Sequence, residues 1–342
     1  MKKRLFFIAL LLAILVTEHA FCRGKSQNKD SPRNAGRERA EYSLAGREQG
    51  SSEPESEKIE NEALMPAAAL EKTEMDRAEQ VMKALAKAYP DRLGPAEIRN
   101  GDWAVPIRGD WYYYADGKLL PEELREKARD YDGQPFYNYP AELPAWKAPE
   151  PEEEERFRGM AERRRRNPSR RSQHFFDALW RAHNKEEAWE RIKSIRFLGH
   201  TVMVHYAILE ELALVEERIL SESKTNSRIR AWIASLSTLD GWNWRGIADT
   251  QSRSFHAYGA ALDILPKNYG RSNTYWLWTA QSTPEWWTVP YEKRLHPPDE
   301  VVKAFEAYGF IWGGKWLFYD TMHFEFRPEI LILNEILLTD MR

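Results

Sequence analysis

Two short motifs, far apart along the chain, constrain what this sequence can fold into more than any other feature. The first carries His256 and Asp263, and the second carries Asp320, His323 and Glu325. Two imidazoles and one carboxylate can hold a metal ion, and catalytic zinc sites use three protein ligands of this kind with a fourth position open for water. The motifs therefore predict a metal centre with His256, Asp263 and His323 as its ligands.

The spacing in the first motif indicates how its two ligands are presented. His256 and Asp263 are seven residues apart, so one straight strand would place them on opposite faces. Gly259, between them, allows the backbone to change direction sharply. We therefore expect His256 on a loop and Asp263 on the strand that follows. Ala261 would share a face with Asp263 and leave room for the metal.

The second motif predicts a strand with a carboxylate at its entrance. His323 and Glu325 alternate with apolar residues, so they share the face that points away from the core. Asp320 precedes His323 by three residues across a turn, and it can approach the metal without being a ligand. A general base for the metal-bound water belongs at such a position.

The charge balance of the 342-residue chain excludes one broad class of function. Lys and Arg number 50 and Asp and Glu 53, which gives a formal net charge of -3. Because binding to the phosphate backbone needs a basic surface, we expect no nucleic-acid partner. The length allows one large domain or two smaller ones.

The N-terminus predicts export. Lys2, Lys3 and Arg4 precede an apolar run at 5–16, which suits a signal peptide over residues 1–22 and is too short for a membrane span. Cys22 is the only cysteine, so no intramolecular disulfide can form. Soluble export to the periplasm or cell envelope is favoured over a lipid anchor at Cys22, because Phe21 stands where lipoprotein signals carry a small residue.

Composition divides the remainder into three segments. Residues 23–75 are polar and almost free of aromatic side chains, which predicts a disordered linker. Residues 76–150 predict an N-terminal extension with one helix and a hairpin that turns at Asp116-Gly117. Residues 151–342 are expected to form the domain that holds the metal.

Hydrophobic periodicity predicts an α+β fold in that last segment. Apolar residues recur at helical spacing in some stretches and alternate in others. The predicted helices lie at 202–220, 228–236 and 298–308, and the predicted strands at 242–247, 259–265 and 322–326.

The first motif resembles the signature of a known enzyme family. Ser254-x-His256-x-x-Gly259-x-Ala261-x-Asp263 is similar to the motif of the zinc D-alanyl-D-alanine carboxypeptidases. That family also contains L-alanyl-D-glutamate endopeptidases and shares its fold with the Hedgehog signalling domain. The resemblance implies a small antiparallel sheet with flanking helices, to which the N-terminal helical and hairpin extension is added.

The second motif resembles the endopeptidase-like branch of the same family. The residues are Trp312-Gly313-Gly314, followed by Asp320-Thr-Met-His323-Phe-Glu325. The resemblance covers 228–328, which would be the core of the domain, and says little about 76–227. Ile264-Leu265-Pro266 replaces polar residues that often follow the family's aspartate, which leaves substrate detail open.

The resemblance also implies roles for individual residues. It makes His256, Asp263 and His323 the Zn²⁺ ligands and Asp320 the general base. Arg245 would stabilise the oxyanion or bind a substrate carbonyl. Ser254 would contact substrate or orient the site, and Glu325 would brace a ligand.

Together these features predict a monomeric zinc metallopeptidase that hydrolyses peptidoglycan stem peptides, as an endopeptidase or a D,D-carboxypeptidase. Two alternatives stay open at this point. One is a non-catalytic envelope-binding module that keeps the fold, which loss of the base or of a ligand would favour. The other is a structural zinc protein, whose site would be closed by a fourth protein ligand.

Overall fold

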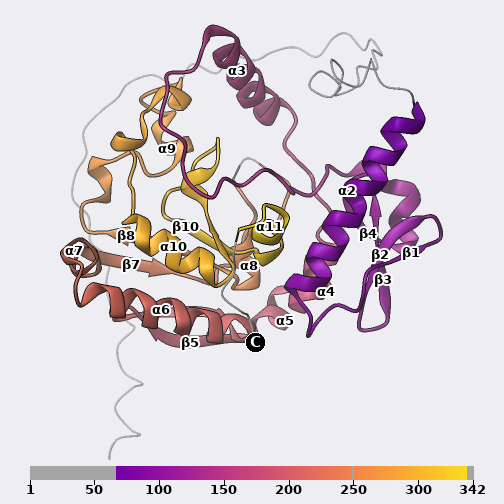
Figure 1. The fold of residues 1–342 in the computed structure, drawn as a ribbon, viewed down its shortest axis with the longest axis horizontal. Coiled ribbons are helices and arrows are strands. Elements are labelled where there is room, and N and C mark those ends of the chain that lie inside the picture. The colour runs from indigo at the N-terminus through magenta and orange to yellow at the C-terminus, as the bar shows by residue number, and fades with distance from the viewer. Residues whose placement is uncertain (1–66, 249, 337–342) are drawn as a thin grey trace, which may run out of the picture. The chain divides into compact units, whose positions relative to one another are not determined.

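Asp263 and His323 lie on neighbouring strands of a four-stranded antiparallel sheet (Figure 1). The structure is a computed structural model that describes residues 67–248 and 250–336. In order across the sheet, the strands are β7 (Leu236–Asp240), β8 (Ala261–Pro266), β10 (His323–Phe326) and β9 (Phe310–Trp312). The predicted strands at 259–265 and 322–326 are confirmed, with small shifts at their ends.

Helices with one apolar face complete the layer beside this sheet. α10 packs against both β9 and α6, which buries Val301 and Phe305 of α10 and Leu212 and Val215 of α6. α11 also contacts β9, and α8 contacts β8. The bounds are α6 (Leu209–Ser223), α7 (Ser227–Ser235), α8 (Phe255–Tyr258), α10 (Asp299–Ala307) and α11 (Pro328–Leu333). The predicted helices at 228–236 and 298–308 are confirmed.

Between the N-terminal strands and α6, the chain forms three α-helices and a hairpin. They are α3 (Pro151–Arg166), α4 (His174–Trp180), α5 (Lys185–Trp189) and the strands β5 (Ile192–Phe197) and β6 (His200–His205). α3 begins with a capping box between Glu150 and Glu153. Its acidic first turn and basic last turn both complement the helix dipole. Phe157 packs α3 against a cluster of Trp side chains that includes Trp286 and Trp287.

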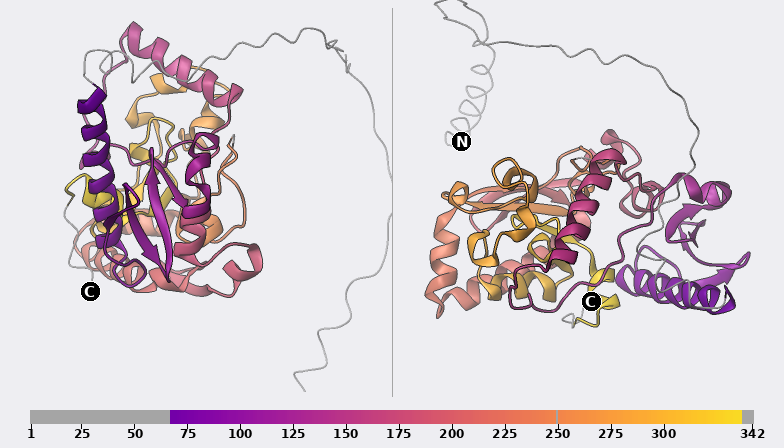
Figure 2. Two further views of the ribbon diagram at one scale, coloured as in Figure 1. Left: turned by 90° about the vertical axis from the view of Figure 1, so that its right-hand side faces the viewer. Right: turned by 90° about the horizontal axis from the view of Figure 1, so that it is seen from above.

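The N-terminal extension is a helix beside an antiparallel meander, seen in the indigo and purple part of Figure 2. Its elements are α2 (Ala67–Ala88), β1 (Glu97–Arg99), β2 (Asp102–Ile107), β3 (Asp110–Ala115) and β4 (Lys118–Pro121). Asp116 and Gly117, between β3 and β4, have φ angles of 49° and 75°. Two successive positive φ values suit a tight hairpin turn, and the predicted hairpin is confirmed.

The extension and the metal-site sheet share one hydrophobic core. Val81 and Leu85 of α2, together with Tyr89 just after it, belong to the same buried cluster as Phe310 and Phe326 of the sheet. All described residues fall within a single compact unit, Glu57–Arg342. The division at residue 150 stays a prediction, and the expected signal peptide and most of the expected linker lie outside the described residues.

Three sequence predictions need correction. The helix predicted at 202–220 begins only at Leu209, because Val202 and Val204 alternate with exposed residues and pair with β5. The strand predicted at 242–247 does not form, and only Gly246 bridges to Arg253. α2 begins at Ala67 rather than near Asp76, so the helix includes the end of the expected linker.

The α+β class is confirmed by this mixture of helices and small antiparallel sheets. Several short elements in the region 76–227, such as α5 and the β5–β6 hairpin, were not predicted. Their apolar runs are too short to distinguish a helix from a strand by periodicity. Within the part of the chain that the structure describes, no helix combines the length and the apolar character that crossing a bilayer requires.

We predict that Gly259→Ala destabilises the fold by about 2–4 kcal/mol. Gly259 has a φ of 70°, and an added Cβ would lie 2.5 Å from Ile192 Cδ1 and 2.7 Å from the backbone nitrogen of His205. Chemical denaturation of both proteins measures the difference in the free energy of unfolding.

The matched control is Gly270→Ala. Gly270 has no positive φ and has no atom within 4 Å of an added Cβ, so its substitution should change stability by less than about 0.5 kcal/mol. Equal effects of the two substitutions would contradict the claim that Gly259 is required where α8 meets β8.

Candidate metal centre

Three potential ligand atoms converge where α8 faces the β8–β10 pair. Asp263 Oδ1 lies 2.9 Å from His323 Nδ1 and 3.1 Å from His256 Nε2. The two imidazole nitrogens are 3.2 Å apart. Two atoms that each lie about 2.0–2.1 Å from a tetrahedral zinc are separated by about 3.3 Å. The spacing of the three atoms therefore fits one zinc ion, and the donor set of two imidazoles and a carboxylate suits that metal.

Local structure explains why these side chains meet. His256 lies on the four-residue helix α8 rather than on the expected loop. Ser254 caps that helix by accepting a hydrogen bond from the backbone N–H of His256, and Gly259 ends it in the left-handed conformation. Asp263 and His323 face each other because they are direct partners in the register of β8 and β10.

The outer nitrogens of both imidazoles have partners that fix the rings. His256 Nδ1 lies 2.5 Å from the Gly241 carbonyl oxygen, which leaves Nε2 to face the centre. His323 Nε2 lies 3.1 Å from Glu325 Oε2, which leaves Nδ1 to face it. Such partners orient metal-bound histidines and raise their basicity. The geometry thus supports the bracing role that was expected for Glu325.

The electrostatic field at this centre favours a cation. Burial alone would lower the pKa of His323, but hydrogen bonds to Asp263 and Glu325 and the charges of these carboxylates outweigh it and raise the pKa to about 10. Burial would raise the pKa of Asp263, yet the charges and hydrogen bonds of His256 and His323 lower it below its usual range. A site that holds a proton so strongly would also stabilise a divalent ion.

Glu325 begins a buried chain of charged groups that the sequence did not predict. Arg327 Nη1 lies 3.4 Å from Glu325 Oε1, and Arg327 Nε donates to Glu329. Tyr89, which directly follows α2, then donates to Glu329 Oε2 at 2.8 Å. Arg327 and Glu329 are 1% and 0% exposed, so their charges are balanced by each other rather than by water. The chain of contacts connects the N-terminal extension to His323.

Asp320 lies at the edge of the same centre. Its backbone is held by a hydrogen bond to Gly313 O and by an antiparallel bridge to Tyr275. Its Oδ1 atom is buried and has no hydrogen-bond partner among the described residues. Burial raises the pKa of Asp320 to about 7, with the charge of His323 opposing the shift and that of Asp263 adding to it. A carboxylate with a free oxygen and a pKa near neutrality is suited to exchange protons.

The structure places Arg245 and Ser254 beside the centre. Arg245 Nη2 lies 3.8 Å from Asp263 Oδ2, and its side chain is 42% exposed. Ser254 is buried and its Oγ caps α8, and its expected contact with substrate stays a prediction. Both residues line the cavity described next.

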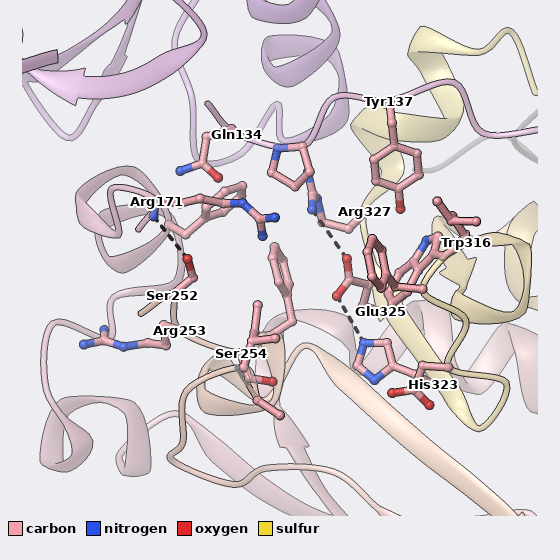
Figure 3. A pocket seen from close by; sticks show the side chains of 18 of the residues that line it. Gln134, Tyr137, Arg171, Ser252, Arg253, Ser254, Trp316, His323, Glu325 and Arg327 are labelled. Atoms are coloured by element: carbon pink, nitrogen blue, oxygen red, sulfur yellow. Dashed lines mark hydrogen bonds and ion pairs between the residues drawn. The ribbon is translucent and has the colours of Figure 1, made fainter. Parts of the chain in front are cut away.

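A cavity of about 520 Å³ opens onto these residues (Figure 3). Asp320, His323 and Glu325 line one part of it. The segment 134–138, which leads out of the N-terminal extension, lines another, and α3 contributes Met160 and Arg164. The cavity is therefore built by three regions of the chain, only one of which carries the two motifs.

We predict that His256→Ala and His323→Ala each abolish high-affinity zinc binding, because each removes one of three ligands. Glu325→Gln should weaken zinc binding by about 10- to 100-fold, since it removes the charge that orients His323. Isothermal titration calorimetry of the zinc-free protein measures all three affinities.

Asp320→Asn is the control for that experiment, because Asp320 is placed beside the ligands and not among them. It should keep the affinity of the unsubstituted protein for zinc. A loss as large as that of His323→Ala would make Asp320 a ligand and would contradict this arrangement.

Comparison with known proteins gives two family matches. Residues 248–326 match the family described as D-alanyl-D-alanine carboxypeptidase. Residues 81–136, most of the N-terminal extension, match a domain family of unknown function. No curated protein and no solved structure matches the chain. The first match contains all three candidate ligands, Asp320 and Glu325, and it begins just after Arg245. The predicted resemblance to the D-alanyl-D-alanine carboxypeptidase family is therefore confirmed over the segment that carries both motifs.

Proposed function

We propose that this protein is a zinc peptidase that hydrolyses peptide bonds in peptidoglycan stem peptides. The observation that carries the proposal is the convergence of His256, Asp263 and His323, with His323 and Asp320 on the wall of one cavity. The match of this segment to a peptidase family supports the same reaction class. Zn²⁺ held by the three ligands would lower the pKa of a bound water and polarise a peptide carbonyl.

The protein's own side chains supply the remaining steps. Asp320 accepts a proton from the attacking water through its unpaired Oδ1 and passes it to the leaving amine. Arg245, on the cavity wall, stabilises the negative charge that develops on the carbonyl oxygen. Glu325 holds the His323 ring so that Nδ1 keeps facing the centre.

The site favours an enzyme over the two alternatives. A binding module that had lost catalysis could dispense with Asp320, yet its carboxylate is present and buried at the centre. A structural zinc site would use four protein ligands. The group of possible ligands among the described residues contains three. The Asp320 and Trp312-Gly313-Gly314 features favour the endopeptidase-like branch, and a D,D-carboxypeptidase is the other candidate within the family.

We further propose the cell envelope as the place of action. The apolar run at 5–16 after three basic residues is typical of export, and stem peptides lie outside the cytoplasmic membrane.

The sheet order and the placement of both motifs on adjacent strands and α8 agree with a fold of the Hedgehog and D,D-peptidase type for 151–342.

Incubation of the zinc-loaded protein with defined muropeptides, read by mass spectrometry, tests the proposal. Release of a terminal alanine would identify a carboxypeptidase, and cleavage after the first L-alanine an endopeptidase. Asp320→Ala should lower kcat by about 10²- to 10⁴-fold, since it removes the general base. A chelated sample should be inactive.

The absence of any zinc-dependent product, despite tight zinc binding, would contradict the proposed activity. That result would favour the non-catalytic binding module. Full activity of Asp320→Ala would leave a peptidase but would remove Asp320 from its mechanism.

A further inference from the structure

Arg171 differs from the other basic residues of the cavity. Its guanidinium makes no hydrogen bond or ion pair with any residue that the structure describes. Figure 3 shows this side chain pointing into the cavity, with Glu325 and His323 on the far side. Basic cavity residues that do have carboxylate partners are Arg245, Arg253, Lys315 and Arg327.

The backbone around Arg171 is held from two sides. Asp132 bridges to Arg171, and its backbone N–H donates to Arg170 O at 2.9 Å. On the other side, Ser252 Oγ accepts from the Arg171 N–H at 3.1 Å, and Ser252 Oγ donates to Ser169 O at 3.2 Å. Because both flanks are bonded, the residue is positioned before any ligand arrives, which reduces the entropy cost of binding.

A second guanidinium donor in the cavity also lacks an acceptor. Arg327 is 1% exposed, and its Nη2 has no hydrogen-bond partner among the residues that the structure describes. Burial lowers the pKa of Arg171, and the nearby charges of Arg164 and Arg327 lower it further. Neighbouring positive charges that are partly withdrawn from water would be stabilised by an anion between them.

We propose that Arg171, supported by Arg327, binds a carboxylate of the peptide substrate at a point of the cavity across from the metal ligands. The planar guanidinium matches a carboxylate through two parallel hydrogen bonds. The inference rests on the proposed peptidase function and deepens it, because it makes the substrate an acidic peptide. It also gives the region before the two motifs a role in recognition.

The test uses the peptide that the protein cleaves and versions of it in which each free carboxylate in turn is a carboxamide. With the unsubstituted protein, one of these carboxamides should lower kcat/KM by about 10- to 100-fold, which is the usual cost of losing a charged hydrogen bond. In Arg171→Gln, the carboxylate peptide and its carboxamide version should have similar kcat/KM values, because neither can then form the contact with Arg171. Arg171→Lys should keep part of the penalty.

Arg170→Gln is the matched control, since Arg170 is the exposed neighbour and does not line the cavity. It should keep the full penalty, and unchanged zinc affinity in all variants would show that the fold is intact. A penalty in Arg171→Gln as large as in the unsubstituted protein would overturn the proposal, as would the absence of a penalty for every carboxamide.

A separate binding measurement distinguishes failure of this inference from failure of the proposed function. Calorimetry with the zinc-loaded Asp320→Asn protein compares the acidic peptide with its carboxamide. A preference for the carboxylate that Arg171→Gln removes would support the anion site even if no peptide is cleaved. Equal affinity for the two peptides would overturn it even if cleavage occurs.

Discussion

The antiparallel pairing of β8 with β10 determines the candidate metal centre, because it sets Asp263 directly opposite His323. Opposed side chains on one face of such a pair have Cβ atoms about 4.5–5.5 Å apart, close enough for both to reach one ion. A register shift of a single residue would turn one ligand to the other face. Gly259 then returns the chain from α8 into β8, so that His256 completes the set from outside the strands.

Next to this strand pair, His323 is positioned by a series of buried charged side chains. Glu325 contacts His323 through one carboxylate oxygen and Arg327 through the other. Arg327 in turn pairs with Glu329, which also accepts a hydrogen bond from Tyr89, the residue after α2. Leaving one member of a buried ion pair without its partner costs about 3–5 kcal/mol. The N-terminal extension is therefore connected to the candidate metal centre by these contacts and also contributes to the cavity wall.

Much of the centre could be predicted from the sequence, because its residues lie within two short motifs whose local geometry is dictated by strand alternation and by glycine. The three candidate ligands, Asp320 and Glu325 were singled out in this way, and the structure brings them close together. The chain from Arg327 to Tyr89 and the position of Arg171 could not be, since they depend on contacts between residues far apart in the sequence. The helix predicted over Val202 failed because β-branched residues there pair with β5, a contact that periodicity alone does not reveal.

Zinc K-edge anomalous diffraction from crystals of the zinc-loaded protein tests the central claim most directly. The account predicts one zinc peak, at about 2.0–2.2 Å from His256 Nε2, Asp263 Oδ1 and His323 Nδ1, with its fourth position open to the cavity. A zinc peak elsewhere, or a site closed by a fourth protein ligand such as Asp320 or Glu325, would contradict it.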